Sequence, residues 1–308
     1  MLVYNNGMQK VLVIGSTVVD ITLYMDHIPS LEEDINLKNQ KMSVGGCAWN
    51  VSNMLRLCNV PYQLFSPAGS GIYGDFVRAA MEEKGIRPAF DSTEANGACY
   101  CLVDAEGNRT FMALHGAEYH IYKNELDKIE MHDTGYIYVC GLEIEETTGN
   151  DILSFLEEHK DKKICFAPGA RVKYIDEDKM KRMLALHPLM HLNRREAGTL
   201  LQNTSLTAND MALSLNHLTL ADVVITDGAK DTVIAEDGIV KTIPACKAEV
   251  IDGNGAGDCH IGSVLAFLAK GYSTSNAVSM ANYYASVETT CSGSVIPDAV
   301  FYKLKGIE

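Results

Sequence analysis

The chain has 308 residues, of which 47% are hydrophobic, and a formal net charge of −14 at pH 7. This length allows a large core within one α/β domain. The acidic balance and the lack of a basic stripe interleaved with aromatics exclude a nucleic-acid partner, and no apolar run approaches the ~20 residues that a membrane span needs.

Strand-like and helical stretches alternate along the chain, without a repeat or a low-complexity linker. This alternation indicates a largely parallel sheet flanked by helices, in a single domain over residues 1–308. The expected strands lie at 10–15, 63–67, 136–140, 163–167, 189–192 and 223–227.

Two further segments, 34–43 and 98–115, show the two-residue alternation of exposed strands. In the second segment Cys99 and Cys101 face one way and Tyr100 faces the other, before a polar turn. We expect a hairpin that extends from the main domain.

A glycine-rich stretch from Asp252 to Asp258 runs directly into a helical pattern of apolar residues. Its glycines let backbone N–H groups converge, and the positive end of the helix dipole adds to an anion site. A carboxylate there would normally repel a phosphate. This cost is explained if the carboxylate takes a proton from the attacking nucleophile. We therefore predict that Asp258 is the general base of a phosphoryl transfer. The alternative is an ordinary loop followed by a capping acid.

A second helix also begins after glycines, at Gly45 and Gly46, with Asn50 in its first turn. Apolar residues follow at helical spacing. Two glycine-led helix starts indicate a site built from loops at one edge of a sheet.

The two motifs together resemble the signatures of the ribokinase-like (PfkB) carbohydrate and nucleoside kinases, over almost the whole chain. Gly253 stands where that family usually has Thr, which removes a hydroxyl but leaves the loop and its terminal Asp. The resemblance implies a ribokinase-like α/β three-layer sandwich with a mostly parallel central sheet. It also implies that the segments 34–43 and 98–115 form a small β-lid over the acceptor, which would exclude water from the site. The matching residues are Gly45, Gly46 and Asn50 in the first signature, and Asp252, Gly255, Ala256, Gly257 and Asp258 in the second.

The resemblance also implies roles for single residues. Asp20, Gly45, Gly46 and Asn50 would bind the acceptor. Glu143 would reach it too, unless it caps a helix. The amides of Gly255, Ala256 and Gly257 would hold the migrating phosphoryl group. Asn193, Thr226, Gly228 and Asn282 would bind ATP, Glu196 would support Mg²⁺ through water, and Asp252, Asn254 and Gly293 would hold K⁺.

Three classes of function remain. The first is a kinase acting on an unphosphorylated sugar, with a nucleoside as the alternative acceptor. Trp49, Phe111 and Tyr119 are the candidate shelves for a base, and Arg109 and Lys38 are the candidate cations for a sugar phosphate. The second is a nicotinamide-dependent oxidoreductase, which the missing Gly-x-Gly-x-x-Gly pattern disfavours. The third is a kinase-like binding protein without turnover, for which Gly253 leaves room.

The nine cysteines are scattered without a disulfide framework, and residues 1–7 lack a basic-then-apolar leader. Both features favour a cytoplasmic location. We expect Cys259 to be a packing residue and His260 to be incidental, since the histidines show no metal-ligand spacing. An exposed apolar face on the lid would favour a homodimer.

Overall fold

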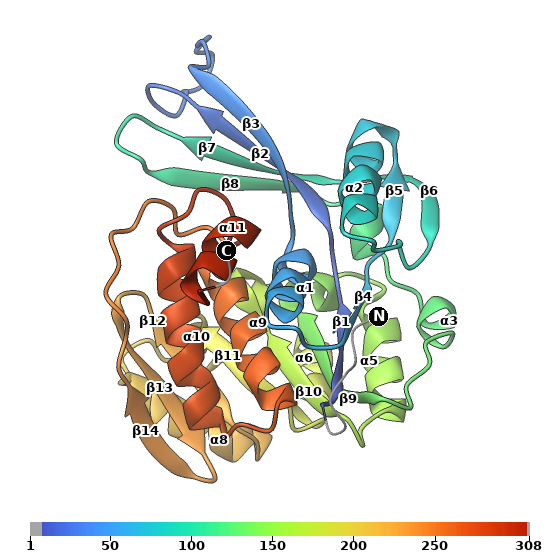
Figure 1. The fold of residues 1–308 in the computed structure, drawn as a ribbon, viewed down its shortest axis with the longest axis vertical. Helices are drawn as coiled ribbons and strands as arrows, with labels where there is room; N and C mark the ends of the chain where they lie inside the picture. The colour runs from blue at the N-terminus through green and yellow to red at the C-terminus, as the bar shows by residue number, and fades with distance from the viewer. Residues whose placement is uncertain (1–7, 307–308) are drawn as a thin grey trace.

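A computed structural model describes residues 8–306; the predicted absence of a leader over residues 1–7 lies outside the described residues. Its centre is an eight-stranded sheet in the order β14-β13-β12-β11-β10-β9-β1-β4 (Figure 1). The strands from β4 to β12 are parallel, and β13 and β14 form an antiparallel hairpin at one edge. Their bounds are β1 Lys10–Ile14, β4 Tyr62–Phe65, β9 Thr134–Cys140, β10 Lys163–Ala167, β11 Leu189–Asn193, β12 Val223–Asp227, β13 Lys230–Glu236 and β14 Ile239–Ile243.

All six predicted strands are present in this sheet, and two of them, β10 and β12, have the predicted bounds. The sequence of β1 is typical of a central strand of a parallel sheet. Its residues Val11 to Ile14 are apolar without interruption and fully buried, because helices cover both faces of the sheet.

Helices cover both faces of the sheet and make a three-layer sandwich. One layer contains α1 Cys47–Leu57, α9 Ala256–Ala269, α10 Thr274–Glu288 and α11 Asp298–Leu304. The opposite face is covered by α5 Gly149–Glu158, α6 Glu177–Leu184, α7 Arg194–Leu200 and α8 Ala208–Thr219. Short helices α3 Lys123–Leu126 and α4 Gly141–Glu145 and the 3₁₀ turns Ala117–Tyr119 and Gly169–Lys173 complete the connections.

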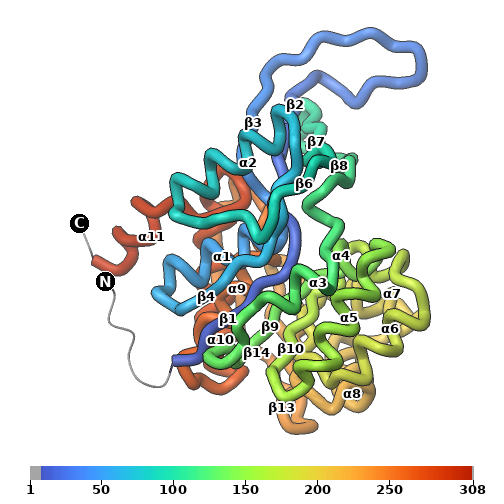
Figure 2. The backbone as a smooth tube through the Cα atoms, turned by 90° about the vertical axis from the view of Figure 1, so that its right-hand side faces the viewer, coloured from blue at the N-terminus to red at the C-terminus, as the bar shows by residue number. Residues whose placement is uncertain are grey.

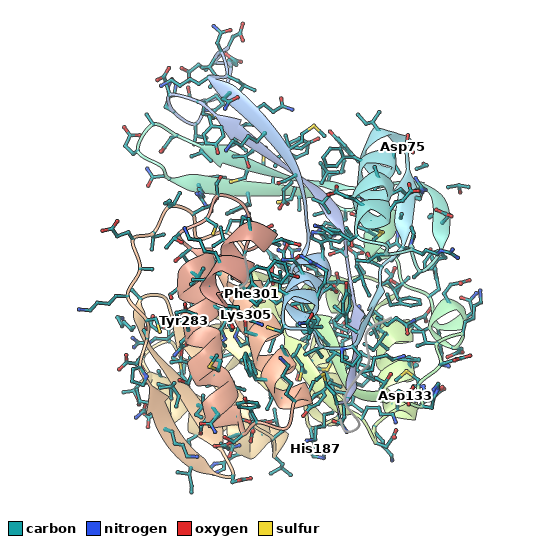
Figure 3. All side chains as sticks on the ribbon, viewed as in Figure 1. Asp75, Asp133, His187, Tyr283, Phe301 and Lys305 are labelled. Carbon is teal, nitrogen blue, oxygen red and sulfur yellow. The ribbon has the colours of Figure 1, made fainter. Side chains whose placement is uncertain are left out.

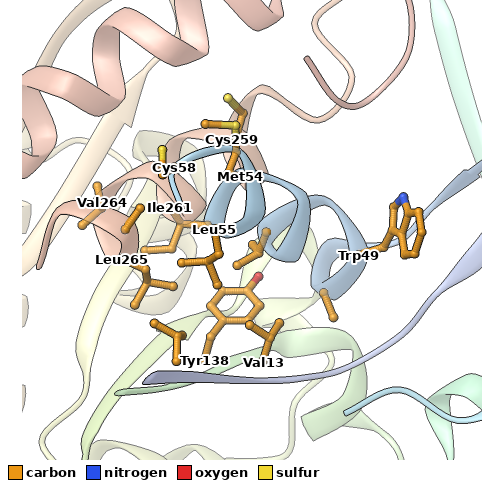
Figure 4. Packing of buried hydrophobic residues seen from close by; sticks show 14 of the residues in the cluster. Val13, Trp49, Met54, Leu55, Cys58, Tyr138, Cys259, Ile261, Val264 and Leu265 are labelled. Carbon is orange, nitrogen blue, oxygen red and sulfur yellow. The ribbon is translucent and has the colours of Figure 1, made fainter. Parts of the chain in front are cut away.

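The core between the sheet and the first layer is made by interdigitating apolar side chains. Leu55 of α1 and Leu265 of α9 lie above Tyr138 of the sheet, as Figure 4 shows. Fully burying one leucine side chain contributes about 1.5–3 kcal/mol to the stability of the folded state. At the outer end of this layer, Phe301 stacks on Tyr284 with ring centroids 5.2 Å apart, and Figure 3 shows Phe301 beside the neighbouring helix.

A second sheet, in the order β3-β2-β7-β8, projects from one end of the molecule and is called the lid below (Figure 1). Its strands are β2 Val18–Tyr24, β3 Asn39–Gly45, β7 Ala98–Val103 and β8 Arg109–Leu114. The hairpin expected within 98–115 is present as β7 and β8. The strand expected at 34–43 runs instead from residue 39 to 45, and the connection before it extends beyond the rest of the lid (Figure 2).

Strand β2 was not among the strands expected from the sequence, which predicted none between residues 15 and 34. The apolar run of β1 resumes almost at once in β2, with only Gly15, Ser16 and Thr17 between them. So short a break does not reveal that the chain leaves one sheet and enters another.

A third, two-stranded sheet of β5 Ala68–Ser70 and β6 Asp91–Ala95 lies beside α2 Gly71–Glu83 at the base of the lid. Across residues 8–306, the helices are all too short or too polar to cross a lipid bilayer.

Candidate active site

The predicted site residues gather at the carboxyl ends of the parallel strands. Glu143 follows β9, Asn193 ends β11 and Gly228 follows β12. The lid stands over the same end of the sheet (Figure 1). Ligands of open α/β sheets bind at this edge, because the loops that follow parallel strands converge there.

Helix α9 begins where the glycine-rich stretch predicted it. Gly255 has a φ of +92°, and a Cβ on it would lie 2.3 Å from the Ser294 carbonyl oxygen. A larger residue would therefore be both strained and in collision. Asp258 lies in the first turn of α9, which places its carboxylate beside the N–H groups that begin the helix.

Asp258 meets the first glycine motif directly. Asn50 Nδ2 of α1 donates a hydrogen bond to Asp258 Oδ2 at 2.9 Å, and Ser294 Oγ donates to Asn50 Oδ1 at 3.1 Å. Gly262 makes this approach of α1 and α9 possible, since a Cβ there would lie 2.9 Å from the Cβ of Met54. Burial raises the pKa of Asp258, and the hydrogen bond from Asn50 partly opposes that rise.

Asp20 lies on β2, next to the same two motifs. A Cβ on Gly45 would lie 2.0 Å from Asp20 Oδ2, so glycine at this position leaves the space that the carboxylate fills. Gly46 has a φ of +100° and leaves room for the Ser16 carbonyl oxygen. Burial, and then the negative charge of Asp258, raise the pKa of Asp20 to about 7.

Glu143 is buried in the first turn of α4. Its Oε1 accepts a hydrogen bond from the Ser16 N–H at 2.7 Å, and its Oε2 accepts one from the Cys140 thiol at 2.8 Å. Glu143 therefore ties the end of β1 to the end of β9. Burial raises the pKa of its carboxyl in spite of these hydrogen bonds.

Asn193 and Glu196 form a reciprocal capping box at the start of α7. Asn193 Oδ1 accepts from the Glu196 N–H at 2.9 Å, and Glu196 Oε2 accepts from the Asn193 N–H at 2.9 Å. Burial raises the pKa of Glu196, with a smaller contribution from the charge of Asp258. Thr226 pairs with Asn193 across β11 and β12, and Gly228 follows with a φ of +60°.

Asn282 belongs to a buried hydrogen-bond network that the sequence analysis missed. Its Oδ1 accepts from Thr232 Oγ1 at 2.8 Å and pairs with His260 Nε2 at 2.9 Å. His260 Nδ1 in turn lies 2.9 Å from His191 Nε2. The network joins α9, β11 and β13, so His260 is a structural residue, and burial lowers its pKa to about 4.

Asp252, Asn254 and Gly293 also lie together. Asp252 Oδ1 accepts from the Asn254 N–H at 2.9 Å, and its Oδ2 accepts from the Gly293 N–H at 3.2 Å. Arg109 Nη1 of the lid reaches the same Oδ1 at 2.5 Å. Glu288 is fully buried nearby, and neither of its carboxylate oxygens has a hydrogen-bond partner within the described structure.

The thiols near the site are not paired as disulfides; all nine cysteines are free. Cys47 lies beside Asp258, a contact that the sequence analysis did not predict. The neighbouring Cys140 thiol lowers the pKa of Cys47, but burial and the charge of Asp258 outweigh it and raise the pKa to about 11. Burial raises the pKa of Cys259 well above its usual value, as expected for a packing residue.

Comparison with known proteins identifies the family. The model of the pfkB family of carbohydrate kinases matches residues 8–299. The chain belongs to the pfkB family. It is 30% identical to an uncharacterized sugar kinase, YegV, of Escherichia coli, over 90% of this chain and 88% of that protein. It is 25% identical to adenosine kinase 2 of Arabidopsis thaliana, over 88% of this chain and 85% of that protein.

Solved structures of pfkB kinases show the same fold. A ribokinase from Thermotoga maritima superposes with a TM-score of 0.83 at 18% identity, covering 97% of this chain and 99% of the ribokinase. The expected ribokinase-like α/β sandwich is thereby confirmed. The chain is an ATP-dependent carbohydrate or nucleoside kinase.

Proposed function

We propose that this kinase transfers the γ-phosphoryl group of ATP to a hydroxyl of a small unphosphorylated sugar. The observation that carries the proposal is the direct hydrogen bond between Asn50 and Asp258. This hydrogen bond holds the amide of Asn50, which belongs to the first glycine motif, against the buried carboxylate of Asp258 in the first turn of α9.

In this mechanism Asp20 and Asn50 bind acceptor hydroxyls and direct one of them toward Asp258. A carboxylate accepts hydroxyl protons, and an amide both donates and accepts, so together they suit a diol. Asp258 takes the proton of the attacking hydroxyl as the phosphoryl group moves. The N–H groups of Gly255, Ala256 and Gly257 would hold the migrating charge. Glu143 supports this end of the sheet through Ser16.

ATP would lie along the ends of β11 and β12, with Asn193, Thr226 and Gly228 beside it. Asn282 has its amide engaged within the protein, because Nδ2 also donates to the Pro244 carbonyl at 2.9 Å. We infer that it supports the adenine side by fixing the chain after β14.

Glu196 would hold Mg²⁺ through water, and the ion would neutralise phosphate charge. In the part of the chain described, no three His, Cys, Asp or Glu side chains are grouped as directly bound metal ligands. K⁺ beside Asp252, Asn254 and Gly293 is also proposed, because the oxygens of the buried Glu288 carboxyl have no hydrogen-bond partner and a nearby cation would stabilise its ionised form.

The acceptor is proposed to be unphosphorylated because the two candidate cations on the lid are already paired. Lys38 pairs with Asp26, and Arg109 pairs with Asp252. A sugar phosphate would have to break one of these ion pairs to bind the same side chain.

A nucleoside is the second candidate, and Phe111 is the residue that favours it. Trp49 and Tyr119 are buried, whereas Phe111 is 52% exposed. Phe111 pairs with Cys101 on β7, and Cys101 points to the same face of the lid as Cys99, two residues earlier. Cys99 pairs with Asp20. Phe111 therefore lies on the face of the lid that carries Asp20. A nucleobase could stack on it.

The opposite face of the lid exposes Met42, Met112 and Leu114. We propose that this apolar face forms a homodimer, which the mass in solution of the parent and of Met112→Glu would test.

A cytoplasmic location remains the prediction from the cysteines.

The proposal is tested by measuring ADP release with Mg²⁺ over a panel of free sugars, sugar phosphates and nucleosides. The panel is run once in K⁺ and once in tetramethylammonium. We expect one free sugar to give the highest kcat/KM. A preferred nucleoside, with its KM raised by Phe111→Ala, would support the second candidate. No turnover with any acceptor, while ATP still binds, would support the non-catalytic alternative.

A further inference from the structure

An ion pair connects the lid to the glycine loop. Arg109 begins β8 and Asp252 precedes the loop, 143 positions later, yet Arg109 Nη1 lies 2.5 Å from Asp252 Oδ1. Arg109 pairs with Val103 on β7. Val103 points to the same face of the lid as Cys99, which pairs with Asp20. The Arg109 side chain therefore leaves the lid on the site-facing side.

The carboxylate that Arg109 binds also organises two backbone segments. Asp252 accepts the Asn254 N–H through Oδ1 and the Gly293 N–H through Oδ2. One side chain thus fixes the first residues of the glycine loop and the segment that contacts Gly255 through Ser294. Any motion of Asp252 would move both segments.

The ion pair is partly shielded from water, with 28% of the Arg109 side chain and 17% of the Asp252 side chain exposed. Partial burial would raise the pKa of Asp252, but the hydrogen bonds from the Asn254 N–H and Arg109 keep it below its usual range. Asp252 therefore stays ionised at neutral pH. An ion pair in this setting is less screened by salt than one on the open surface.

We propose that Arg109 is a positioning residue for phosphoryl transfer. With the lid over the site, Arg109 holds Asp252 and thereby sets the position of the N–H groups from Gly255 to Gly257. Closure over the acceptor and ordering of the anion-binding loop then become one event. This rests on the phosphate-holding role proposed for that loop.

The first test is Arg109→Met, which keeps an unbranched apolar stem and removes the guanidinium with its charge. We expect kcat to fall by about 10- to 100-fold, the range that misplacement of reacting groups produces, and Arg109→Lys to recover part of the loss. The matched control is Arg182→Met, because Arg182 pairs with Glu157 between α6 and α5, on the far layer of helices. It should keep the parent kcat.

Guanidinium chloride at millimolar concentration separates positioning from folding. We expect guanidinium to restore part of kcat in Arg109→Met, because it can bind Asp252 in place of the missing side chain. An equal concentration of NaCl should not, and Arg182→Met should not respond. A lowered kcat with a lowered melting temperature and no recovery would show that Arg109 is merely structural, and would overturn the proposal.

A second readout needs no substrate. Hydrogen exchange of the Asn254 and Gly293 amides, which donate to Asp252, should be faster in Arg109→Met than in the parent and in Arg182→Met. Unchanged exchange would overturn the proposal whatever the kinetics. If the parent shows no turnover with any acceptor, the proposed function fails, and the exchange measurement still decides whether Arg109 positions the loop.

Discussion

Asn50 and Asp258 are joined by a hydrogen bond of 2.9 Å, although 208 positions separate them in the chain. The contact exists because α1 and α9 pack closely at Gly262, where any Cβ would meet Met54. The two glycine-led helices therefore converge on one acid. The hydrogen bond also controls the chemistry of that acid, because it stabilises the ionised form.

Replacing Asn50 should change the pH dependence of the reaction. In Asn50→Ala, Asp258 loses the hydrogen bond that lowers its pKa, so its pKa rises and it is ionised only at higher pH. A hydrogen bond to a charged group is worth about 1.5–3 kcal/mol. We therefore expect the acid limb of kcat against pH to move to higher pH. Ser294→Ala, which removes the other partner of Asn50, should shift it less. An acid limb that stays in place would contradict the role of Asn50.

Asp20 should impose a second pH dependence, on acceptor binding. Its pKa of about 7 means that the carboxyl is protonated below neutrality, and only the ionised form accepts hydroxyl protons with both oxygens. We expect kcat/KM for the acceptor to rise between pH 6 and pH 8, and the step near pH 7 to be absent in Asp20→Asn. A step of the same size in that variant would assign the titration to another group.

Glu288 should make the protein less stable as the pH rises. Burial, followed by the charges of Asp252 and Asp258, raises its pKa to about 8, whereas an unfolded Glu has a pKa near 4.3. Between these values the folded state holds a proton that the unfolded state releases, so the free energy of unfolding falls with pH.

The variant Glu288→Gln lacks the titrating carboxyl, so its free energy of unfolding does not show this decrease with pH. The free energy of unfolding of the variant relative to the parent should therefore rise by on the order of 3 kcal/mol between pH 5 and pH 8. Urea unfolding at the two pH values, without added K⁺, measures it. A difference that does not vary with pH would mean that Glu288 ionises normally.

Gly253 should tolerate the threonine that the family usually carries. Its φ is not positive, and a Cβ on it would meet no atom within 4 Å. Gly253→Thr should therefore fold normally. By restricting the unfolded chain it should gain about 0.4–1 kcal/mol of stability, the range typical of a glycine replaced without strain. Thermal unfolding and kcat measure the outcome, with Gly255→Thr as the strained control. A destabilised Gly253→Thr would show that the loop requires glycine there.

Much of the fold was predictable, because buried parallel strands are continuous apolar runs and helix starts carry glycines or capping residues. The strands at 163–167 and 223–227 show this for the sheet, and Asp258 shows it for the helix start. Strand β2 was not predictable, since three residues of loop do not show that the chain changes sheets.

The site was predictable only as separate motifs. The order of the sheet brings Asn193 and Thr226 side by side, and each had been assigned to the nucleotide. No local pattern revealed that Arg109 would reach Asp252, that Cys47 would lie beside Asp258, or that His260 would bind Asn282. Such contacts depend on how distant elements pack, and a single sequence does not contain that information in any one window.

The most direct test of the account is Asp258→Asn, assayed for ATP binding and for a single turnover with the best acceptor. The substitution keeps the shape of the side chain but removes the base. We expect turnover to fall by about 10²- to 10⁴-fold, the usual contribution of a general base. ATP binding should be retained or tightened, because a buried negative charge leaves the phosphate site. Near-parent turnover in this variant would contradict the assignment of Asp258 as the base.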